Sequence, residues 1–169
     1  MGDSFTVGIG QPFEETWPRL LEKKINKKCI NLGEDGCSND TISLRVKKIC
    51  NLYRPKLIIV MWSYLSRRRL NGEDVQFDKN DFGNIADSNN FIKNCKTISK
   101  LKTKIIQTII PNAYLDMTPQ IFNYLLLKNK FNVLNFPQLD YARDHYHFDI
   151  KTSKYVIDLL IKKINNFDK

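Results

Sequence analysis

The chain has 169 residues, 42% of them hydrophobic and 27% charged, a balance typical of one globular domain with a buried core. Its longest apolar run, Leu57 to Trp62, is far shorter than the roughly 20 residues of a membrane-spanning helix. No signal peptide follows Met1, so the sequence predicts a soluble, cytoplasmic protein with no membrane span.

The formal net charge of +9 could attract nucleic acid, anionic lipid or an acidic substrate. The lysines, however, are scattered over positions that we expect to be the outer faces of helices, and only Arg67 to Arg69 form a tight cluster. We therefore interpret the charge as ordinary solvated surface. Nucleic-acid binding remains a minor alternative that rests on the net charge and this cluster.

Cysteine and histidine are too few and too dispersed to suggest a metal site. None of the four cysteines (Cys29, Cys37, Cys50 and Cys95) forms a CxxC pair, and the two histidines lie close together near the end of the chain. We expect reduced, mostly buried thiols, and neither a metal nor an organic cofactor.

The predicted elements alternate between helices and short apolar strands. Thr16 begins a first helix, Cys29 to Leu32 form a short strand, and a second helix runs from Asn39 to the break at Pro55. The run from Leu57 to Trp62 is apolar at every position, as a parallel strand covered on both faces requires.

The second half continues the same alternation after a polar stretch. Its predicted elements are a long loop (71–90), a helix to about Leu101, a strand (104–110), a helix from Thr118, a strand (131–136) and a final helix from Ile150. No repeat or linker interrupts the pattern, so residues 1–169 are predicted to form a single α/β domain with a parallel sheet.

Two motifs at opposite ends of the chain could supply hydrolytic chemistry. Gly2-Asp3-Ser4 contains a hydroxyl nucleophile, and Asp144-His145-Tyr146-His147 places an acid and a base three residues apart before a helix. Nucleophilic catalysis needs such a hydroxyl, a base to accept its proton, and a carboxylate to orient the imidazole. Asp149 is the expected N-cap of the last helix.

Each of these residues also has an ordinary structural interpretation. Ser4 alone is more often a turn or cap residue, His147 a packed or surface histidine, and Asp144 a solvated charge. His145 and Asp140 are rival members of a triad, less well placed than His147 and Asp144.

A third motif, Asn31 to Asn39, contains two glycines and opens the second helix. A GDS block, then a glycine block, then a DxxH block before the last helix is an order that resembles the SGNH/GDSL hydrolase family. The resemblance covers essentially the whole chain. It implies a three-layer α/β/α sandwich with a flavodoxin-like parallel sheet.

The resemblance also implies roles for individual residues. Ser4 would attack an ester carbonyl, His147 would be the general base, and Asp144 would orient it. The backbone N–H groups of Ser4 and Gly36 would hold the oxyanion, and glycine suits that position because no Cβ blocks the substrate. The implied substrate is a small-molecule or carbohydrate ester, or a lipid, with no cofactor.

The sequence departs from the family in its third block. The family pattern Gly-x-Asn-Asp is replaced by Met61-Trp62-Ser63-Tyr64, as in a divergent, phage-like branch. Ser63 and Asn39 are the candidate substitutes for the missing asparagine donor. Loss of one donor without a substitute costs about 2.7–4 kcal/mol of transition-state stabilisation.

Two further departures concern the ends of the motifs. Phe148 follows His147 where the family commonly has proline, and only Met1 precedes the GDS block where the family has a central strand. The second departure leads us to expect a sequence truncated at its start. A missing segment could include a signal, which weakens the expectation of a cytoplasmic location.

Two functions of different classes follow. The first is a serine ester hydrolase that removes acyl or acetyl groups, with its site at the carboxyl edge of the sheet and the 71–90 segment as one wall. The second is an inactive module of the same fold that binds a glycan or protein. Arg67 is expected to pair with Asp74 or Asp78, or to face an acidic substrate group.

Overall fold

A parallel sheet forms the middle layer of the computed structural model, which describes residues 1–76, 83–111, 113 and 126–167. The sheet contains β1 (Leu57–Trp62), β4 (Lys104–Ile109) and β5 (Val133–Leu134), in the order β1-β4-β5. β1 and β4 pair in parallel along their full length, from Leu57 opposite Lys104 to Trp62 opposite Ile109. The apolar run at 57–62 is therefore the buried parallel strand that the sequence predicts.

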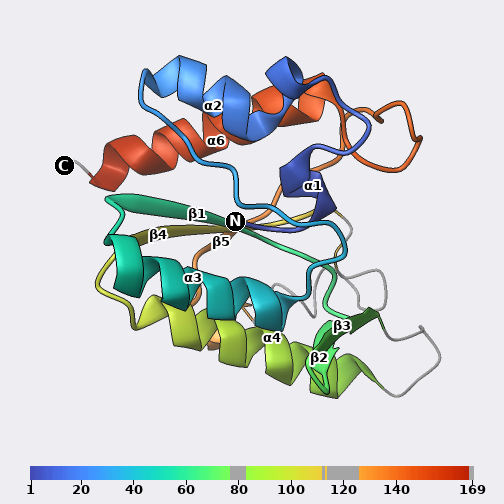
Figure 1. Cartoon of the computed structure of the whole chain (residues 1–169), viewed down its shortest axis with the longest axis vertical. Helices are drawn as coiled ribbons and strands as arrows, with labels where there is room; N and C mark the ends of the chain where they lie inside the picture. Colours follow the sequence, from blue (N-terminus) through green and yellow to red (C-terminus); the bar gives the residue numbers. More distant parts are fainter. Residues whose placement is uncertain (77–82, 112, 114–125, 168–169) are drawn as a thin grey trace.

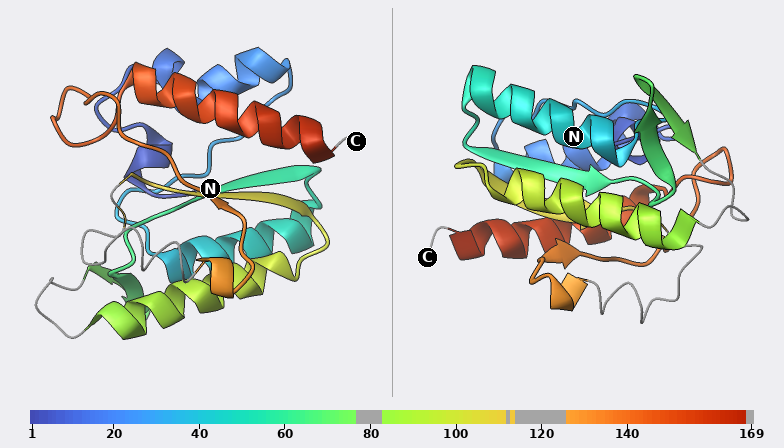
Figure 2. Two further views of the ribbon diagram at one scale, coloured as in Figure 1. Left: turned by 180° about the vertical axis from the view of Figure 1, so that it is seen from behind. Right: turned by 90° about the horizontal axis from the view of Figure 1, so that it is seen from below.

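Helices cover both faces of this sheet, as Figure 1 and Figure 2 show. One layer holds α3 (Asn39–Tyr53) and α4 (Gly83–Ser99), and the other holds α2 (Trp17–Ile25) and α6 (Ile150–Phe167). The predicted three-layer α/β/α fold is thus confirmed. Among the described residues, no helix has both the length and the apolar character needed to cross a membrane.

The first two residues extend the sheet on the free side of β1. The carbonyl of Met1 accepts a hydrogen bond from the N–H of Met61 at 2.9 Å, and the amino group of Met1 donates to the carbonyl of Ile59 at 3.1 Å. Gly2 forms a parallel bridge with Gly33. The chain then turns at once into the short helix α1 (Ser4–Val7), so the GDS block lies beside β1.

Several predicted elements differ from the structure. Residues 29–32 are not a strand. Among the described residues, this segment pairs with the start of the chain only through the single bridge between Gly33 and Gly2, which is too short to form a ladder. The predicted strand at 131–136 is reduced to Val133–Leu134, since Lys130 takes a left-handed φ of 56° and pairing with β4 ends at Thr108. The helix predicted from Thr118 lies outside the described residues up to 125.

The predicted polar loop at 71–90 is also wrong in part. β2 (Arg67–Leu70) and β3 (Glu73–Gln76) form an antiparallel hairpin, and α4 already begins at Gly83. Asn71 and Gly72 have φ values of 52° and 92°, as a two-residue turn with positive φ at both positions requires. An Asn-Gly pair is the usual sequence signal for such a hairpin.

The hairpin is fixed to the first turn of α3 by two carboxylates. Asp74 accepts hydrogen bonds from the hydroxyls of Ser38 and Thr41 at 2.5 and 2.6 Å. Asp40 accepts the backbone N–H of Arg69 at 2.9 Å. β2, the strand that follows the carboxyl end of β1, is therefore held in place against α3.

Replacing Gly33 with alanine is expected to lower the free energy of unfolding by about 1–3 kcal/mol, the usual cost of overpacking. A Cβ at this position would lie 2.8 Å from the nitrogen of Val7 and 3.0 Å from the carbonyl carbon of Thr6, both backbone atoms of α1. Urea unfolding measures the change. The exposed Asp35→Ala variant in the same segment is the control, and equal stability of the two variants would contradict the close packing of Gly33 on α1.

Candidate active site

Ser4 is the first residue of α1, at the carboxyl edge of the sheet. Asp3 caps this helix: its Oδ1 atom accepts the N–H of Phe5 at 3.1 Å, and its carbonyl accepts the N–H groups of Thr6 and Val7. Gly8, with a φ of 87°, ends the helix after four residues. The Ser4 side chain is therefore held on a short turn, and only 2% of its surface is exposed.

His147 approaches Ser4 from the loop that precedes α6. Its Nε2 atom lies 2.8 Å from the Ser4 hydroxyl oxygen, and its Nδ1 atom lies 2.5 Å from Oδ2 of Asp144. The other carboxylate oxygen of Asp144 accepts the backbone N–H groups of Tyr146 and His147, both at 3.0 Å. The structure thus brings together the three residues that the sequence singles out, in the order hydroxyl, imidazole, carboxylate.

The hydrogen bonds at Asp144 favour its charged form. Partial burial opposes ionisation, but the N–H of Tyr146 and the side chain and N–H of His147 outweigh it and hold the pKa of Asp144 below its ordinary value. A charged Asp144 next to Nδ1 fixes the imidazole with its Nε2 atom toward Ser4. This is the arrangement in which Nε2 can accept the serine proton.

Aromatic contacts fix the plane of the imidazole. The centre of the ring of Phe5, the residue after Ser4, lies 4.5 Å from the centre of the His147 ring. The Tyr146 ring packs edge-on against His147, with the two ring centres 5.2 Å apart. The hydroxyls of Tyr146 and Tyr64 are 2.5 Å apart, which links the DxxH loop to the end of β1. These aromatic residues could not be identified from the sequence, since nothing in their spacing distinguishes them from core positions.

The rival triad residues have other positions. Asp140 accepts backbone N–H groups of Asp149, Lys151 and Thr152 at the start of α6, and these bonds lower its pKa although burial opposes them. Asp149 does precede α6, and its carbonyl accepts the N–H of Ser153 as an N-cap residue's does. The predicted side-chain bonds are wrong, because Asp140 accepts these N–H groups and Oδ1 of Asp149 has no hydrogen-bond partner among the described residues. His145 lies in the exposed turn, with a φ of 57°.

The two backbone N–H groups that the sequence predicts as oxyanion donors have no acceptor among the described residues. Within the described part of the chain, neither the N–H of Ser4 nor that of Gly36 donates a hydrogen bond. Gly36 is exposed, with a φ of 70°, and no heavy atom lies within 4 Å of the place of a Cβ. The role of these two N–H groups as oxyanion donors stays a prediction.

Ser63 and Asn39, the candidate substitutes for the third donor, are engaged elsewhere. The amide oxygen of Asn39 accepts the N–H of Ser63 at 2.8 Å, and its nitrogen donates to the carbonyls of Ser63 and Tyr64 at 3.4 and 3.0 Å. The hydroxyl of Ser63 donates to Oδ2 of Asp3 at 2.5 Å. Their role as oxyanion donors stays a prediction, and it requires exchange of these bonds.

Asp3, directly before Ser4, is completely buried in a small polar network. Nη1 of Arg67 lies 3.2 Å from the Oδ2 atom that Ser63 also contacts. Burial raises the pKa of Asp3 to about 6, although Ser63 and Arg67 both favour the carboxylate. The sequence predicts Asp74 or Asp78 as the partner of Arg67. In the structure Arg67 pairs with Asp3, and Asp74 instead accepts hydrogen bonds from Ser38 and Thr41. Asp78 lies outside the described residues.

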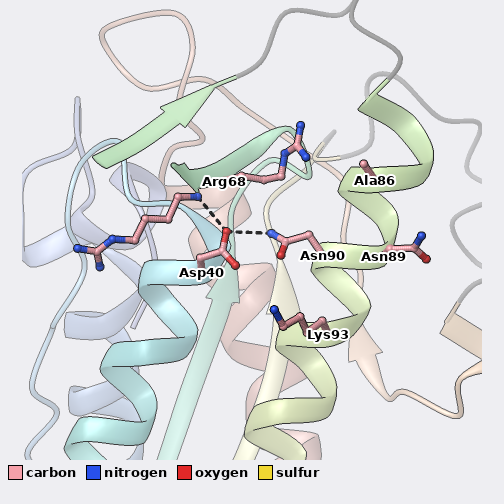
Figure 3. A pocket seen from close by; sticks show the side chains of 7 residues that line it. Asp40, Arg68, Ala86, Asn89, Asn90 and Lys93 are labelled. Carbon is pink, nitrogen blue, oxygen red and sulfur yellow. Dashed lines mark hydrogen bonds between the residues drawn. The ribbon is translucent and has the colours of Figure 1, made fainter. Parts of the chain in front are cut away.

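A hollow of about 450 Å³ lies apart from these residues, over α3, β2 and α4 (Figure 3). Its lining consists of Asp40, Arg68, Arg69, Ala86, Asn89, Asn90 and Lys93. Asp40 already accepts three hydrogen bonds and Arg68 pairs with Asp87, so much of the charge is satisfied within the protein. The residues with a catalytic geometry are instead Ser4, His147 and Asp144. In the described chain no group of three metal-ligating side chains converges.

Comparison of the fold identifies its class. No family model matches the chain, and no curated protein matches its sequence. The esterase EstA from Pseudoalteromonas sp., in a structure inhibited by monoethylphosphonate, is 17% identical with a TM-score of 0.65, covering 99% of this chain and 95% of EstA. A member of the G-D-S-L lipolytic family from Veillonella parvula is 16% identical with a TM-score of 0.65, and the match covers 95% of this chain and 93% of that protein. An acetyl xylan esterase is 13% identical with a TM-score of 0.66, and the match covers 96% of each chain. The chain therefore has the SGNH/GDSL hydrolase fold.

Replacing Gly10 with alanine is expected to disturb the Asp144 loop. A Cβ at Gly10 would lie 2.9 Å from Cβ of Ala142 and 3.1 Å from Cγ of Asp144. The matched control is Gly72→Ala, which has a similar positive φ but open space around it. Both variants lose about 1–2 kcal/mol from the left-handed backbone, and Gly10→Ala is expected to lose about 1–3 kcal/mol more. Equal losses in urea unfolding would contradict the contact between Gly10 and Asp144.

The buried Asp3 predicts a pH dependence of stability. Between about pH 4 and 6 the folded chain holds a proton on Asp3 that the unfolded chain has released, so the free energy of unfolding falls as pH rises through this window. Above about pH 7, where Asp3 is ionised in both states, this contribution is constant. The unfolding free energy of the parent minus that of Asp3→Asn is expected to fall by roughly 2–3 kcal/mol from pH 4 to 7. A difference that is flat or rises with pH would contradict the burial of this carboxyl.

Proposed function

We propose that the protein is a serine ester hydrolase, with Ser4 as nucleophile, His147 as general base and Asp144 as the carboxylate that orients it. The observation that carries this proposal is the pair of contacts at His147: Nε2 to the Ser4 hydroxyl at 2.8 Å and Nδ1 to Asp144 at 2.5 Å. A base held between a hydroxyl and a carboxylate is the geometry that acyl transfer needs.

The reaction proceeds in two halves on these residues. The Ser4 oxygen attacks the ester carbonyl carbon as His147 takes the hydroxyl proton, and the carbonyl oxygen becomes an oxyanion. The free N–H groups of Ser4 and Gly36 are the donors for that charge. The bond to the alcohol then breaks, and His147 gives its proton to the leaving oxygen. Water, deprotonated by His147, attacks the acyl-serine. The bond to the Ser4 oxygen then breaks, the acid leaves, and His147 returns its proton to Ser4.

The fold supports an ester as substrate. The neighbours of similar fold include an esterase inhibited by a phosphonate and an acetyl xylan esterase. We therefore propose small acyl esters, such as acetyl groups on a carbohydrate, as the class to test first. The polar surface of the β2–β3 hairpin is the proposed wall of the site toward the alcohol part of the substrate.

The small number of unbonded oxyanion donors leads us to expect a slow enzyme. Ser63 and Asn39 are bonded within the protein, so two free N–H groups remain where three donors are common. The same observation favours the second candidate, a module of this fold that binds a glycan or protein without hydrolysing it. A direct activity measurement separates the two.

We expect the purified chain to hydrolyse p-nitrophenyl acetate or butyrate, and the Ser4→Ala and His147→Ala variants to lose about 10³-fold or more of kcat. His145→Ala is the matched control, because this exposed histidine in the same turn makes no contact with Ser4 and its loss is expected to leave the rate unchanged. Circular dichroism and urea unfolding check that each variant is folded.

A serine-directed phosphonate gives an independent test of the nucleophile. It is expected to label Ser4 of the parent, with a mass shift on the peptide that contains residues 1–19, and to leave Ser4→Ala unlabelled. A folded parent that neither hydrolyses these esters nor reacts with the phosphonate would reject the hydrolase and favour the binding module.

A further inference from the structure

The strand β2 brings a guanidinium to the buried carboxylate that precedes the nucleophile. Nη1 of Arg67 lies 3.2 Å from Oδ2 of Asp3 and 3.2 Å from the hydroxyl of Ser63, which itself donates to the same Oδ2 atom. Only 14% of the Arg67 side chain is exposed, and none of Asp3 is. This ion pair is therefore part of the interior beside Ser4, where charge interactions are little screened.

Besides its bonds to Asp3 and Ser63, Arg67 makes two further contacts that fix its position. Its Nε atom donates to Oε1 of Gln76, the residue opposite it in the hairpin, at 3.1 Å. Its guanidinium carbon lies 5.2 Å from the centre of the Tyr64 ring. The side chain is consequently pre-oriented toward Asp3 before any substrate binds.

The strand that carries Arg67 is itself anchored to both helices of its layer. Two residues further on, the N–H of Arg69 donates to Asp40 of α3. Asn90 of α4 donates to the same carboxylate at 2.9 Å (Figure 3), and Asn94 of α4 donates to it at 3.0 Å. A side chain on such a strand is suited to hold another group in place, because its own backbone is already bonded.

The charge on Asp3 matters because this carboxylate caps α1. Oδ1 of Asp3 accepts the N–H of Phe5, and a carboxylate is a stronger acceptor for a helix N-terminus than a carboxylic acid. Burial favours the protonated acid, while Ser63 and Arg67 favour the carboxylate. Without the guanidinium the balance moves toward the acid, and the cap that sets the position of Ser4 weakens.

We propose that Arg67 is a positioning residue of the Ser4 site, which keeps Asp3 in its carboxylate form and thereby holds α1 and the Ser4 hydroxyl in register with His147. The inference rests on the proposed ester hydrolysis. It assigns to Arg67 a role inside the protein rather than contact with the substrate.

The test is a double-mutant cycle of Arg67→Gln and Asp3→Asn, with kcat and KM for p-nitrophenyl acetate measured from pH 5 to 9. Asparagine keeps the oxygen that accepts the Phe5 N–H but carries no charge to be neutralised. The titratable groups that face Asp3 and Arg67, namely Cys37, Tyr64 and His147, are common to all four proteins, so their own titration cancels in the cycle.

Arg67→Gln is expected to lower kcat about tenfold with little change in KM, and to move the acid limb of the kcat profile to higher pH. In the Asp3→Asn background the same substitution is expected to change kcat less than about twofold. Arg67→Lys, which keeps the positive charge, is expected to have an acid limb at nearly the same pH as the parent. Arg54→Gln removes the same charge from an exposed position between α3 and the start of β1, outside the hairpin, and is the control, with unchanged kcat.

An equal loss of kcat from Arg67→Gln in both backgrounds would overturn the proposal, since the guanidinium would then act on the substrate or the oxyanion directly. No loss in either background would overturn it as well. A parent inert to esters and phosphonate rejects the proposed function instead; the link between Arg67 and Asp3 is then judged from the same cycle in urea unfolding, where additive effects would overturn it.

Discussion

The buried carboxylate of Asp3 is the interaction on which the candidate site depends. It lies at the point where the chain leaves the edge of β1 and turns into α1, and it bonds the N–H of Phe5, the hydroxyl of Ser63 and the guanidinium of Arg67. These partners come from α1, the end of β1 and the start of β2. One buried charge thus ties the nucleophile turn to the sheet, and its burial is tolerated because every one of these groups donates to it.

The topology explains why residues at the two ends of the chain meet. Met1 and Gly2 lie beside β1 at the carboxyl edge, and the loop before α6 returns to the same edge, so Ser4 and His147 are in contact although 143 positions separate them. Parallel strands place their carboxyl ends together, and this is where open α/β sheets bind ligands. Close packing of Gly10 on the Asp144 loop completes the contact between the two ends.

The buried parallel strand and the helices that cover it were predictable from hydrophobic pattern: the apolar run at 57–62 and the amphipathic stretches at 17–25 and 150–167. The three-layer arrangement itself was expected from the resemblance to the family. The contacts among Ser4, His147 and Asp144 were anticipated only through the order of three motifs. The partner of Arg67 and the cap of α6 were not, because nothing local in the sequence says that Asp3 will be buried or that Asp140 will reach Lys151 and Thr152. The hairpin was missed although its Asn71-Gly72 turn carried the signal.

The most direct test of the account is a crystal structure of the chain after reaction with an ethylphosphonate ester, whose tetrahedral phosphorus stands in for the intermediate of ester hydrolysis. We expect phosphorus bonded to the Ser4 oxygen, one phosphoryl oxygen within hydrogen-bond distance of the N–H groups of Ser4 and Gly36, and His147 still bonded to Asp144. A phosphonate on any other residue, or a phosphoryl oxygen that points away from Gly36, would contradict the site described for this fold.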